Sequence, residues 1–322
     1  MKQICASCVG INVNKIIKTN NDSLPKWLQH TDYVIEFIQN QKKIKEFHRQ
    51  SASMKMDLDV GVSKVGKYVL YWGAADSHSP LIKDAKKSYY IGFRIYKMRV
   101  IDPNTVINLV KAFKKEFGNK MDLIVDAVQG STSTPWSTKV SINLAKELEE
   151  YKILFFEEPC RVENLEGYKD IKQSTNLNIA GAESIPTARA FKPYLDANVF
   201  DIVQFDIATS GFTEGRRIAD LAYVHNKSIA IHSWGSAISI MAGLHFSLSI
   251  PNSAFTEYCF MDHPINEHLF EEGKLTITNG YINKPKTYGL GVKFDESIIS
   301  KYPYKEKINT MISTVEEDIK LV

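Results

Sequence analysis

The sequence has no apolar run close to the ~18 residues that a membrane-spanning helix requires. Its N-terminus also lacks the basic-then-apolar layout of a secretory signal peptide. Neither sign of charge is in excess, because 40 basic residues stand against 37 acidic ones, a net charge of +3. This balance argues against nucleic acid or an anionic membrane as a partner. We therefore expect a cytoplasmic protein that binds neither.

Cysteine is scarce, with four residues in a chain of 322, and this limits the metal and redox chemistry of the thiols. Cys5 and Cys8 have the spacing of a redox pair or of half a zinc site. A second closely spaced pair is missing, and no strand–helix–strand pattern of the thioredoxin type follows. We interpret the cysteines as ordinary reduced thiols, in keeping with a cytoplasmic protein.

Low-complexity linkers and close internal repeats are also missing, but an architectural repetition runs through the middle of the chain. Short apolar runs end there in a charged or titratable residue. These residues are Asp126, Glu157, Glu183, Asp206, His232 and Glu257. The shortest step is 206−183=23 residues and the longest is 157−126=31, which suits one strand, one crossover helix and two loops. Because charged residues are normally kept out of buried strands, one at every strand end indicates a shared site.

Two further strands are expected before these six, at about 65–72 and 91–100, and eight strands close a barrel. The segments between strands have helical character. In the first of them, Asp102 is a candidate N-cap with Pro103 at the first helical position, and Gly118 ends the helix. Its apolar face would consist of Val106, Leu109, Val110, Phe113 and Phe117. Strand and helix in alternation predict an α/β fold of the (β/α)8 type, a modified TIM barrel.

In a parallel barrel the carboxyl ends of all strands open on the same face. Asp126, Glu157 and Glu183 would therefore converge from three consecutive strands. Three carboxylates close together repel one another unless a cation neutralises them. Ligation by oxygen alone suits Mg²⁺, whereas zinc is less favoured because no cysteine or histidine belongs to the trio. The alternative is that each acid forms an ion pair with a basic residue at the rim.

The next two strand ends carry Asp206 and His232. An aspartate that holds one ring nitrogen of a histidine makes the other nitrogen more basic, so the two could transfer a proton. Across the opening, strand alternation turns Lys97 and Arg99 to one face of the second strand and Tyr96 to the other. Two cations directed into a barrel end indicate that anions are bound there.

Several short motifs resemble the enolase superfamily, within its mandelate racemase/muconate lactonizing enzyme-like group, and particularly its acid-sugar dehydratases. They occur in family order between about residues 90 and 295. They are Gly92-Phe93-Arg94-Ile95-Tyr96-Lys97-Met98-Arg99-Val100, Val125-Asp126-Ala127, Phe156-Glu157-Glu158-Pro159, Ala180-Gly181-Ala182-Glu183-Ser184, Gln204-Phe205-Asp206, His232-Ser233-Trp234-Gly235-Ser236, Glu257-Tyr258 and Tyr288-Gly289-Leu290-Gly291-Val292.

The resemblance implies a set of roles. Asp126, Glu157 and Glu183 would bind Mg²⁺, with Glu158 behind them. His232 and Asp206 would be the acid/base pair. Lys97 and Arg99 fall on the family's pair of lysines, and Glu257 on a hydrogen-bonding acid of the eighth strand. The implied chemistry removes the proton α to a carboxylate, and the metal and nearby cations stabilise the enediolate that results.

The resemblance also implies how the chain is divided. Residues 1–60 would form a shortened N-terminal capping region and residues 61–260 the barrel. Residues 261–322 would form a C-terminal segment that packs on both and completes the cap. We also expect the protein to form a homo-oligomer.

Two residues depart from the family pattern. Arg99 replaces a lysine that can act as a second base, and a guanidinium is effectively never deprotonated. Val128 stands where the family commonly has asparagine. The first departure favours a one-sided reaction on a small hydroxy-carboxylate, namely dehydration of an acid sugar. A racemase, epimerase or cycloisomerase of the same superfamily is an alternative, and so is a non-catalytic protein that binds metal or carboxylate.

Overall fold

The structure is a computed structural model, and it describes residues 68–74, 78–130, 132, 134–258, 268, 270, 275–286, 289–293 and 296–302. The predicted capping region 1–60, with Cys5 and Cys8, lies outside these residues. So do residues 65–67 of the first predicted strand and much of the segment 261–322. The division into three parts therefore stays a prediction.

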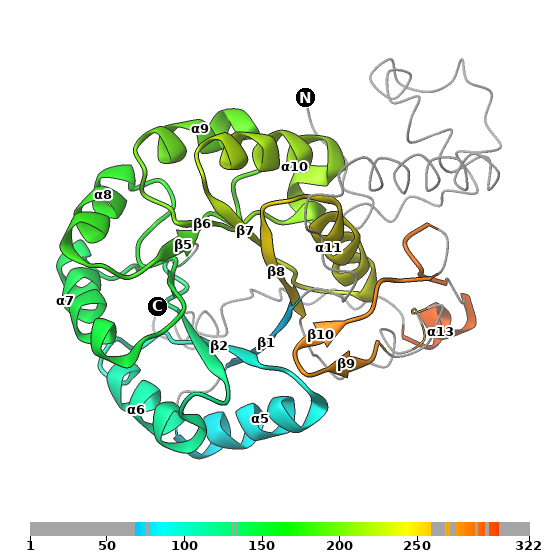
Figure 1. The fold of residues 1–322 in the computed structure, drawn as a ribbon, viewed down its shortest axis with the longest axis horizontal. Coiled ribbons are helices and arrows are strands. Elements are labelled where there is room, and N and C mark those ends of the chain that lie inside the picture. The colour runs from blue at the N-terminus through cyan, green and yellow to red at the C-terminus, as the bar shows by residue number, and fades with distance from the viewer. Residues whose placement is uncertain are drawn as a thin grey trace, which may run out of the picture.

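Eight parallel strands close into a barrel, as predicted (Figure 1). Each strand pairs with the next in the sequence, and the last also pairs with the first, where Leu70 lies opposite both Ile95 and Glu257. The strands are β1 (Tyr68–Ala74), β2 (Ile95–Arg99), β3 (Asp122–Asp126), β4 (Phe156–Glu157), β5 (Ile179–Gly181), β6 (Ile202–Val203), β7 (Ser228–Ile231) and β8 (Ser253–Tyr258). The six charged or titratable residues of the sequence pattern thus lie at or just beyond six neighbouring strand ends.

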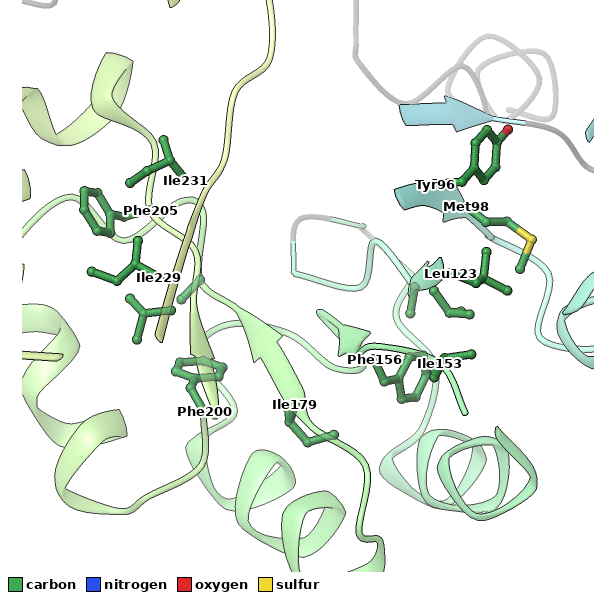
Figure 2. Close-up of a cluster of buried hydrophobic side chains, with 14 of the residues drawn as sticks. Tyr96, Met98, Leu123, Ile153, Phe156, Ile179, Phe200, Phe205, Ile229 and Ile231 are labelled. Atoms are coloured by element: carbon green, nitrogen blue, oxygen red, sulfur yellow. The ribbon is translucent and has the colours of Figure 1, made fainter. Parts of the chain in front are cut away.

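Helices connect the strands and cover the outside of the barrel (Figure 1). They are α5 (His78–Ile91), α6 (Val106–Phe117), α7 (Thr138–Leu148), α8 (Leu165–Ser174), α9 (Ala188–Asp196), α10 (Ile207–Val224) and α11 (Ala237–Ser249), with a short 3-10 turn, η2 (Glu149–Tyr151), after α7. In the described part of the chain, each helix is too short or too polar to span a membrane. The outward-facing strand residues and the helices share the large apolar core, part of which Figure 2 shows.

Helix α6 tests the sequence-based boundaries. Its five predicted core residues are all buried, and Gly118, with φ 54°, ends it by donating its N–H to Lys114. Its predicted start is wrong. The Asp102 carboxylate instead accepts the N–H of Asn104 at 3.0 Å in a local turn, so the helix begins at Val106 after Thr105. Aspartate favours both helix N-caps and such turns, and the local sequence does not decide between them.

The inside of the barrel is built in two layers that follow the two-residue period of a strand. The lower layer is apolar: Ile95, Ile124, Phe155, Ala180, Ala230 and Phe255. Two residues further along most of the strands, the inward side chains become polar. This upper layer consists of Lys97, Asp126, Glu157, Gln204, His232 and Glu257. The apolar layer closes the barrel beneath the polar one, which keeps water away from it on that side.

Strand β5 departs from this period. Two residues after Ala180 stands Ala182, which packs in the outer core instead of facing inward. The backbone turns at this point, with φ 151° at Gly181 and φ 76° at Ala182. The reversal brings the next residue, Glu183, to the polar end of the barrel, which explains why the charged residue comes one position late on this strand.

The C-terminal segment contacts the N-terminal end of the barrel. Strands β9 (Ile277–Thr278) and β10 (Tyr281–Ile282) form a hairpin, and Tyr281 pairs with Tyr68 at the start of β1. Gly92, before β2, has φ 123°, and a Cβ there would lie 2.6 Å from the carbonyl oxygen of Ile277. A short helix, α13 (Glu296–Lys301), follows. Contact of this segment with residues 1–60 lies outside the described residues.

Replacing Phe155 by alanine tests the apolar floor. Phe155 is fully buried, and its ring stacks on Phe255 with the centroids 6.0 Å apart. We expect Phe155→Ala to lower the free energy of unfolding, measured in urea, by about 3–5 kcal/mol because a cavity forms. The control is Leu154→Ala, at a neighbouring residue that is only partly buried. An equal loss in both variants would contradict the layer as described.

Candidate functional site

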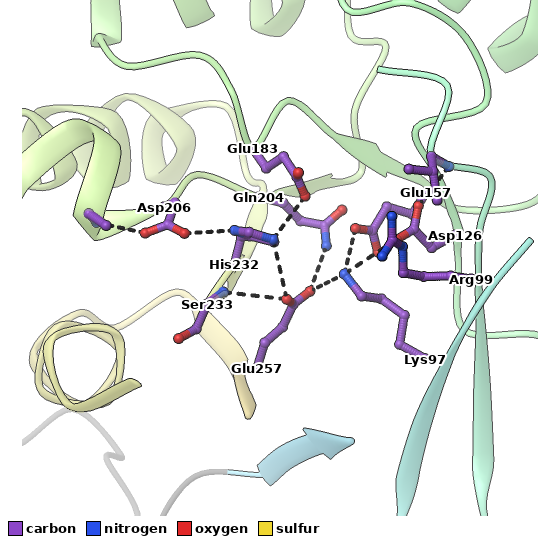
Figure 3. A network of polar contacts seen from close by, with 12 residues as sticks. Lys97, Arg99, Asp126, Glu157, Glu183, Gln204, Asp206, His232, Ser233 and Glu257 are labelled. Carbon is purple, nitrogen blue, oxygen red and sulfur yellow. Dashed lines mark hydrogen bonds and ion pairs between the residues drawn. The ribbon is translucent and has the colours of Figure 1, made fainter. Parts of the chain in front are cut away.

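All eight residues that the sequence predicts for the site lie at the carboxyl ends of the barrel strands. Most of them point toward one another there, and a network of polar contacts joins them (Figure 3). They are Lys97, Arg99, Asp126, Glu157, Glu183, Asp206, His232 and Glu257. The network has one pole around Lys97 and a second around His232, and Glu257 lies between them. The individual roles of these residues stay predictions.

The first pole is an ammonium group enclosed by carboxylates. Nζ of Lys97 lies 2.6 Å from Glu257, 2.7 Å from Glu157 and 3.7 Å from Asp126, and no part of its side chain is exposed. Burial by itself would lower the pKa of Lys97. Glu157, Glu257 and Asp126 outweigh that effect and hold the pKa well above its ordinary value. Lys97 is therefore a fixed positive charge.

The second pole is the imidazole of His232, held from both sides. Nδ1 lies 2.8 Å from Asp206, and Nε2 lies 3.0 Å from Glu183. Asp206 is itself fixed, because its other oxygen accepts the N–H of Ala208 at the start of α10. Burial favours the neutral ring, but Glu183 and Glu257 raise the pKa of His232 well above the ordinary value. In return, the contact with His232 overcomes the effect of burial on Glu183 and lowers the pKa of that carboxyl to about 2.

Glu257 joins the two poles. Its Oε1 accepts hydrogen bonds from Lys97 and, at 3.3 Å, from Nε2 of Gln204. Its Oε2 accepts the N–H of Ser233 at 3.4 Å and lies 3.9 Å from Nε2 of His232. Since Glu257 is 2% exposed, its carboxylate is held rigidly between the two halves of the site.

Arg99 is the outermost cation of the site. It follows Lys97 by two residues on β2, and its side chain is 18% exposed. Its Nε lies 3.9 Å from Asp126, and its guanidinium lies 5.9 Å from the centre of the Trp234 ring. Arg99 therefore places positive charge at the rim of the site, above the buried ammonium of Lys97.

The donor set fits a divalent cation. Six carboxylates gather here (Asp126, Glu157, Glu158, Glu183, Asp206 and Glu257), against the permanent charges of Lys97 and Arg99. Burial is the main cause that raises the pKa of Asp126 and of Glu157, and a neighbouring carboxylate adds to it, Glu183 for Asp126 and Asp126 for Glu157. A further cation would stabilise the charged form of both groups. Oε2 of Glu157 is buried without a hydrogen-bond partner. All of these donors are hard oxygen atoms, which suits Mg²⁺.

The three expected ligands are engaged with protein cations in this structure. Lys97 holds Glu157 and lies near Asp126, while Glu183 pairs with His232. Consistent with this, among the described residues no three acidic, histidine or cysteine side chains are close enough together to hold a metal ion. Binding a cation at Asp126, Glu157 and Glu183 together would therefore require these side chains to move closer to one another than they are here.

The backbone is strained where the three expected ligands stand. Val128, Glu158 and Ala182 have φ values of 56°, 40° and 76°, and each lies within two residues of Asp126, Glu157 or Glu183. Non-glycine residues rarely adopt such values, least of all a β-branched one. At Val128 this conformation directs the backbone N–H to Oδ1 of Asp126 at 2.8 Å. Strain of this kind clusters at functional sites, so it is an independent indication of one.

Gln204, Ser233 and Trp234 complete the site without having been assigned to it from the sequence. Gln204 is fully buried, and its position two residues after Ile202 could have identified it. The contribution of Ser233 is a backbone N–H, which sequence patterns do not reveal. Gly130 is a further requirement, because a Cβ there would lie 2.3 Å from the carboxylate of Glu158.

Comparison with known proteins adds to this geometry. Residues 81–298 match the family described as enolase C-terminal domain-like. The chain is 29% identical over 244 residues to D-galactonate dehydratase from Ralstonia pickettii, covering 71% of this chain and 63% of that protein. It is 33% identical over 190 residues to D-xylonate dehydratase from Haloferax volcanii, covering 59% and 45%.

A solved structure shares the fold. The crystal structure of 3,6-anhydro-D-galactonate cycloisomerase from Zobellia galactanivorans superposes with a TM-score of 0.70 at 28% identity, covering 79% of this chain and 70% of that one. The chain matches only part of each curated relative. In the two dehydratases above and in others with comparable identity, the matched stretch covers 39–63% of the relative's own length.

The strain at Val128 can be tested by substitution. Asparagine tolerates positive φ better than valine, so we expect Val128→Asn to raise the free energy of unfolding by about 1 kcal/mol. The matched control is Val128→Ile, which keeps the β-branch and should give no gain. Chemical denaturation measures both variants. Equal stability of the two would mean that the backbone at this position is not strained.

Proposed function

The chain belongs to the enolase superfamily, with residues 81–298 forming its enolase C-terminal domain-like part, and from this premise we propose that it is a Mg²⁺-dependent dehydratase of acid sugars. It would remove the proton α to the carboxylate of a hydroxylated acid and expel the β-hydroxyl as water. The observation that carries this proposal is that, among the described residues, only one side of the site offers a group placed to exchange protons with the substrate.

That side is His232. Opposite it, Lys97 is buried among three carboxylates that stabilise its charged form, and Arg99 keeps its proton at any ordinary pH. A racemase needs a base on each face of the substrate carbon. With both opposing groups permanently cationic, the arrangement favours a reaction in which one residue removes the proton and returns it to the leaving hydroxyl.

Asp206 prepares His232 for this role. Its contact with Nδ1 fixes the ring orientation and directs Nε2 into the site. In this structure Oε2 of Glu183 lies 3.0 Å from Nε2 and stabilises the protonated ring. Glu183 would therefore have to move away before Nε2 could take a proton from the substrate. Once His232 has taken the α-proton, the protonated ring can donate it to the β-hydroxyl, which leaves as water. The resulting enol then becomes the 2-keto-3-deoxy acid.

The other residues bind the substrate carboxylate and neutralise its charge. Asp126, Glu157 and Glu183 would hold Mg²⁺, which, when bound, supplies Lewis-acid stabilisation of the negative charge on the substrate oxygens. Lys97 and Arg99 add fixed positive charge on the side of the site opposite His232. These charges are already in place, so they need not reorganise during the reaction. Glu257 keeps Lys97 in place.

The substrate class is supported by the relatives. Two of them are named as dehydratases, of D-galactonate and D-xylonate, although each is matched over only part of its length. The similarity to 3,6-anhydro-D-galactonate cycloisomerase favours a second candidate. In it, the enediolate would go on to an isomer of the substrate, and no water would be lost. A cycloisomerase could use the same one-sided arrangement of His232.

Turnover of acid sugars tests the proposal. We expect the purified full chain with Mg²⁺ to convert at least one acid of a panel that includes D-galactonate and D-xylonate. NMR would detect the 2-keto-3-deoxy product, and chelation of Mg²⁺ should abolish its formation. A product with the mass of the substrate would favour the cycloisomerase. Folded protein that binds Mg²⁺ and converts none of the panel would overturn the proposal.

Substitution of His232 tests the one-sided chemistry. We expect His232→Asn to lower kcat by a factor of about 10²–10⁴, the usual contribution of a general acid/base, and to abolish exchange of the α-proton in D₂O. The matched control is His225→Asn, at the end of α10, where the ring lies 3.7 Å from Asp196 and outside the site. Continued α-proton exchange in His232→Asn would show that another residue is the base.

A further inference from the structure

Gln204 stands out in the polar layer because it is the uncharged amide among ionisable side chains. It extends inward from the end of β6 (Ile202–Val203) and is fully buried. Figure 3 shows it between the Glu183–His232 pair and the Lys97–Glu157 pair, where the reaction proposed above would take place. An amide in this position can both donate and accept hydrogen bonds, whereas a carboxylate can only accept them.

Chemistry determines which way the amide points. Its Nε2 donates a hydrogen bond to Oε1 of Glu257 at 3.3 Å. Glu257 is held between Lys97 and the Ser233 N–H, so its oxygens act as acceptors and the NH₂ group must face them. Oε1 of Gln204 therefore points away from Glu257, as Figure 3 shows.

That oxygen has no hydrogen-bond partner, although it is completely buried. Leaving a buried acceptor unsatisfied costs about 1–3 kcal/mol, and a residue such as methionine would fill the same space without this penalty. Oε2 of Glu157 lacks a partner in the same layer. A cation would satisfy the oxygen of Glu157, whereas the amide oxygen of Gln204 requires a hydrogen-bond donor, which a bound molecule would supply.

We propose that Gln204 determines specificity by accepting, through Oε1, a hydrogen bond from the C2 hydroxyl of the bound acid. This inference rests on the proposed function. The leaving β-hydroxyl requires a proton donor, so an acceptor would not assist its departure. The C2 hydroxyl is retained through the reaction as the enol and has a proton to donate. Gln204 would thus select 2-hydroxy acids and, through Nε2, hold Glu257 against Lys97.

Binding of a matched pair of ligands tests this assignment. The probes are the tightest-binding acid sugar of the panel and its 2-deoxy counterpart, added to the Mg²⁺-loaded full chain. His232→Asn serves as the background so that turnover does not consume the ligand. We expect calorimetry to give a Kd for the 2-deoxy acid about tenfold or more above that of the parent acid, the effect of one buried hydrogen bond and the acceptor that it satisfies.

Gln204→Met removes the acceptor while keeping a similar volume. We expect it to weaken binding of the parent acid by about tenfold and to leave the 2-deoxy acid within about threefold, so that the ratio falls toward one. The control is Gln129→Met. Gln129 is also buried, but it donates to the carbonyl of Ala127 and accepts the N–H of Trp136, so its loss should leave the ratio unchanged.

Several results would overturn the proposal. Equal binding of the two acids by the background protein would exclude recognition of the C2 hydroxyl, as would equal weakening of both by Gln204→Met or failure to bind any acid sugar. Loss of Mg²⁺ affinity in Gln204→Met, titrated without acid, would make Oε1 a metal ligand instead. The proposed function can fail independently of this assignment. If the 2-deoxy acid binds about tenfold more weakly than the parent acid, but the unmodified chain forms no 2-keto-3-deoxy product, the dehydratase is overturned and the role of Gln204 stands.

Discussion

The buried ammonium group of Lys97 is the interaction on which the rest of the site depends. Glu157 and Glu257 each lie within 2.7 Å of it, and both are almost completely buried. Removing one partner of a buried ion pair leaves an uncompensated charge and typically costs about 3–5 kcal/mol. Lys97 has two such partners, so it holds the polar layer together. The same contacts keep Lys97 charged, which argues against a role as a base and supports the proposal that His232 transfers the proton.

The strained backbone provides a second constraint, and it acts on the carboxylates themselves. Regular strand geometry would direct Ala182 into the barrel, yet the turn at Gly181 and Ala182 replaces it with Glu183. Strain at such positions costs about 1–3 kcal/mol each and persists only where the surroundings enforce it. The surroundings here are a closed sheet on one side and packed helices on the other. The rigid barrel therefore supports the conformations that bring the three acids to the same end of the barrel.

Much of this arrangement can be predicted from the sequence because it depends only on the two-residue period of the strands and on their order in the barrel. The two-residue alternation of a strand predicts that Lys97 and Asp126 face inward, and the parallel barrel predicts that they meet. The contact between Glu183 and His232 does not follow, because it joins side chains of β5 and β7 across β6, and their separation depends on the curvature of the sheet. Gln204 carries no charge, so the pattern of charged strand ends passes over it. The predicted start of α6 at Asp102 and Pro103 was wrong because an aspartate can form either a helix N-cap or a local turn. Both use hydrogen bonds to neighbouring backbone N–H groups, so the sequence does not distinguish them.

The two departures from the family pattern, Val128 and Arg99, change the surroundings of the carboxylates and of His232 and leave those side chains themselves in place. With valine in place of asparagine at position 128, the backbone N–H still binds Asp126, so the carboxylate keeps its orientation. With arginine in place of lysine at position 99, the rim stays positive but loses a group that can release a proton. Both changes leave the acids and His232 in place. The decisive variable is then the position of the Glu183 side chain, because its Oε2 occupies Nε2 of His232 in this structure. The proposed reaction needs Nε2 to be free for a proton of the substrate.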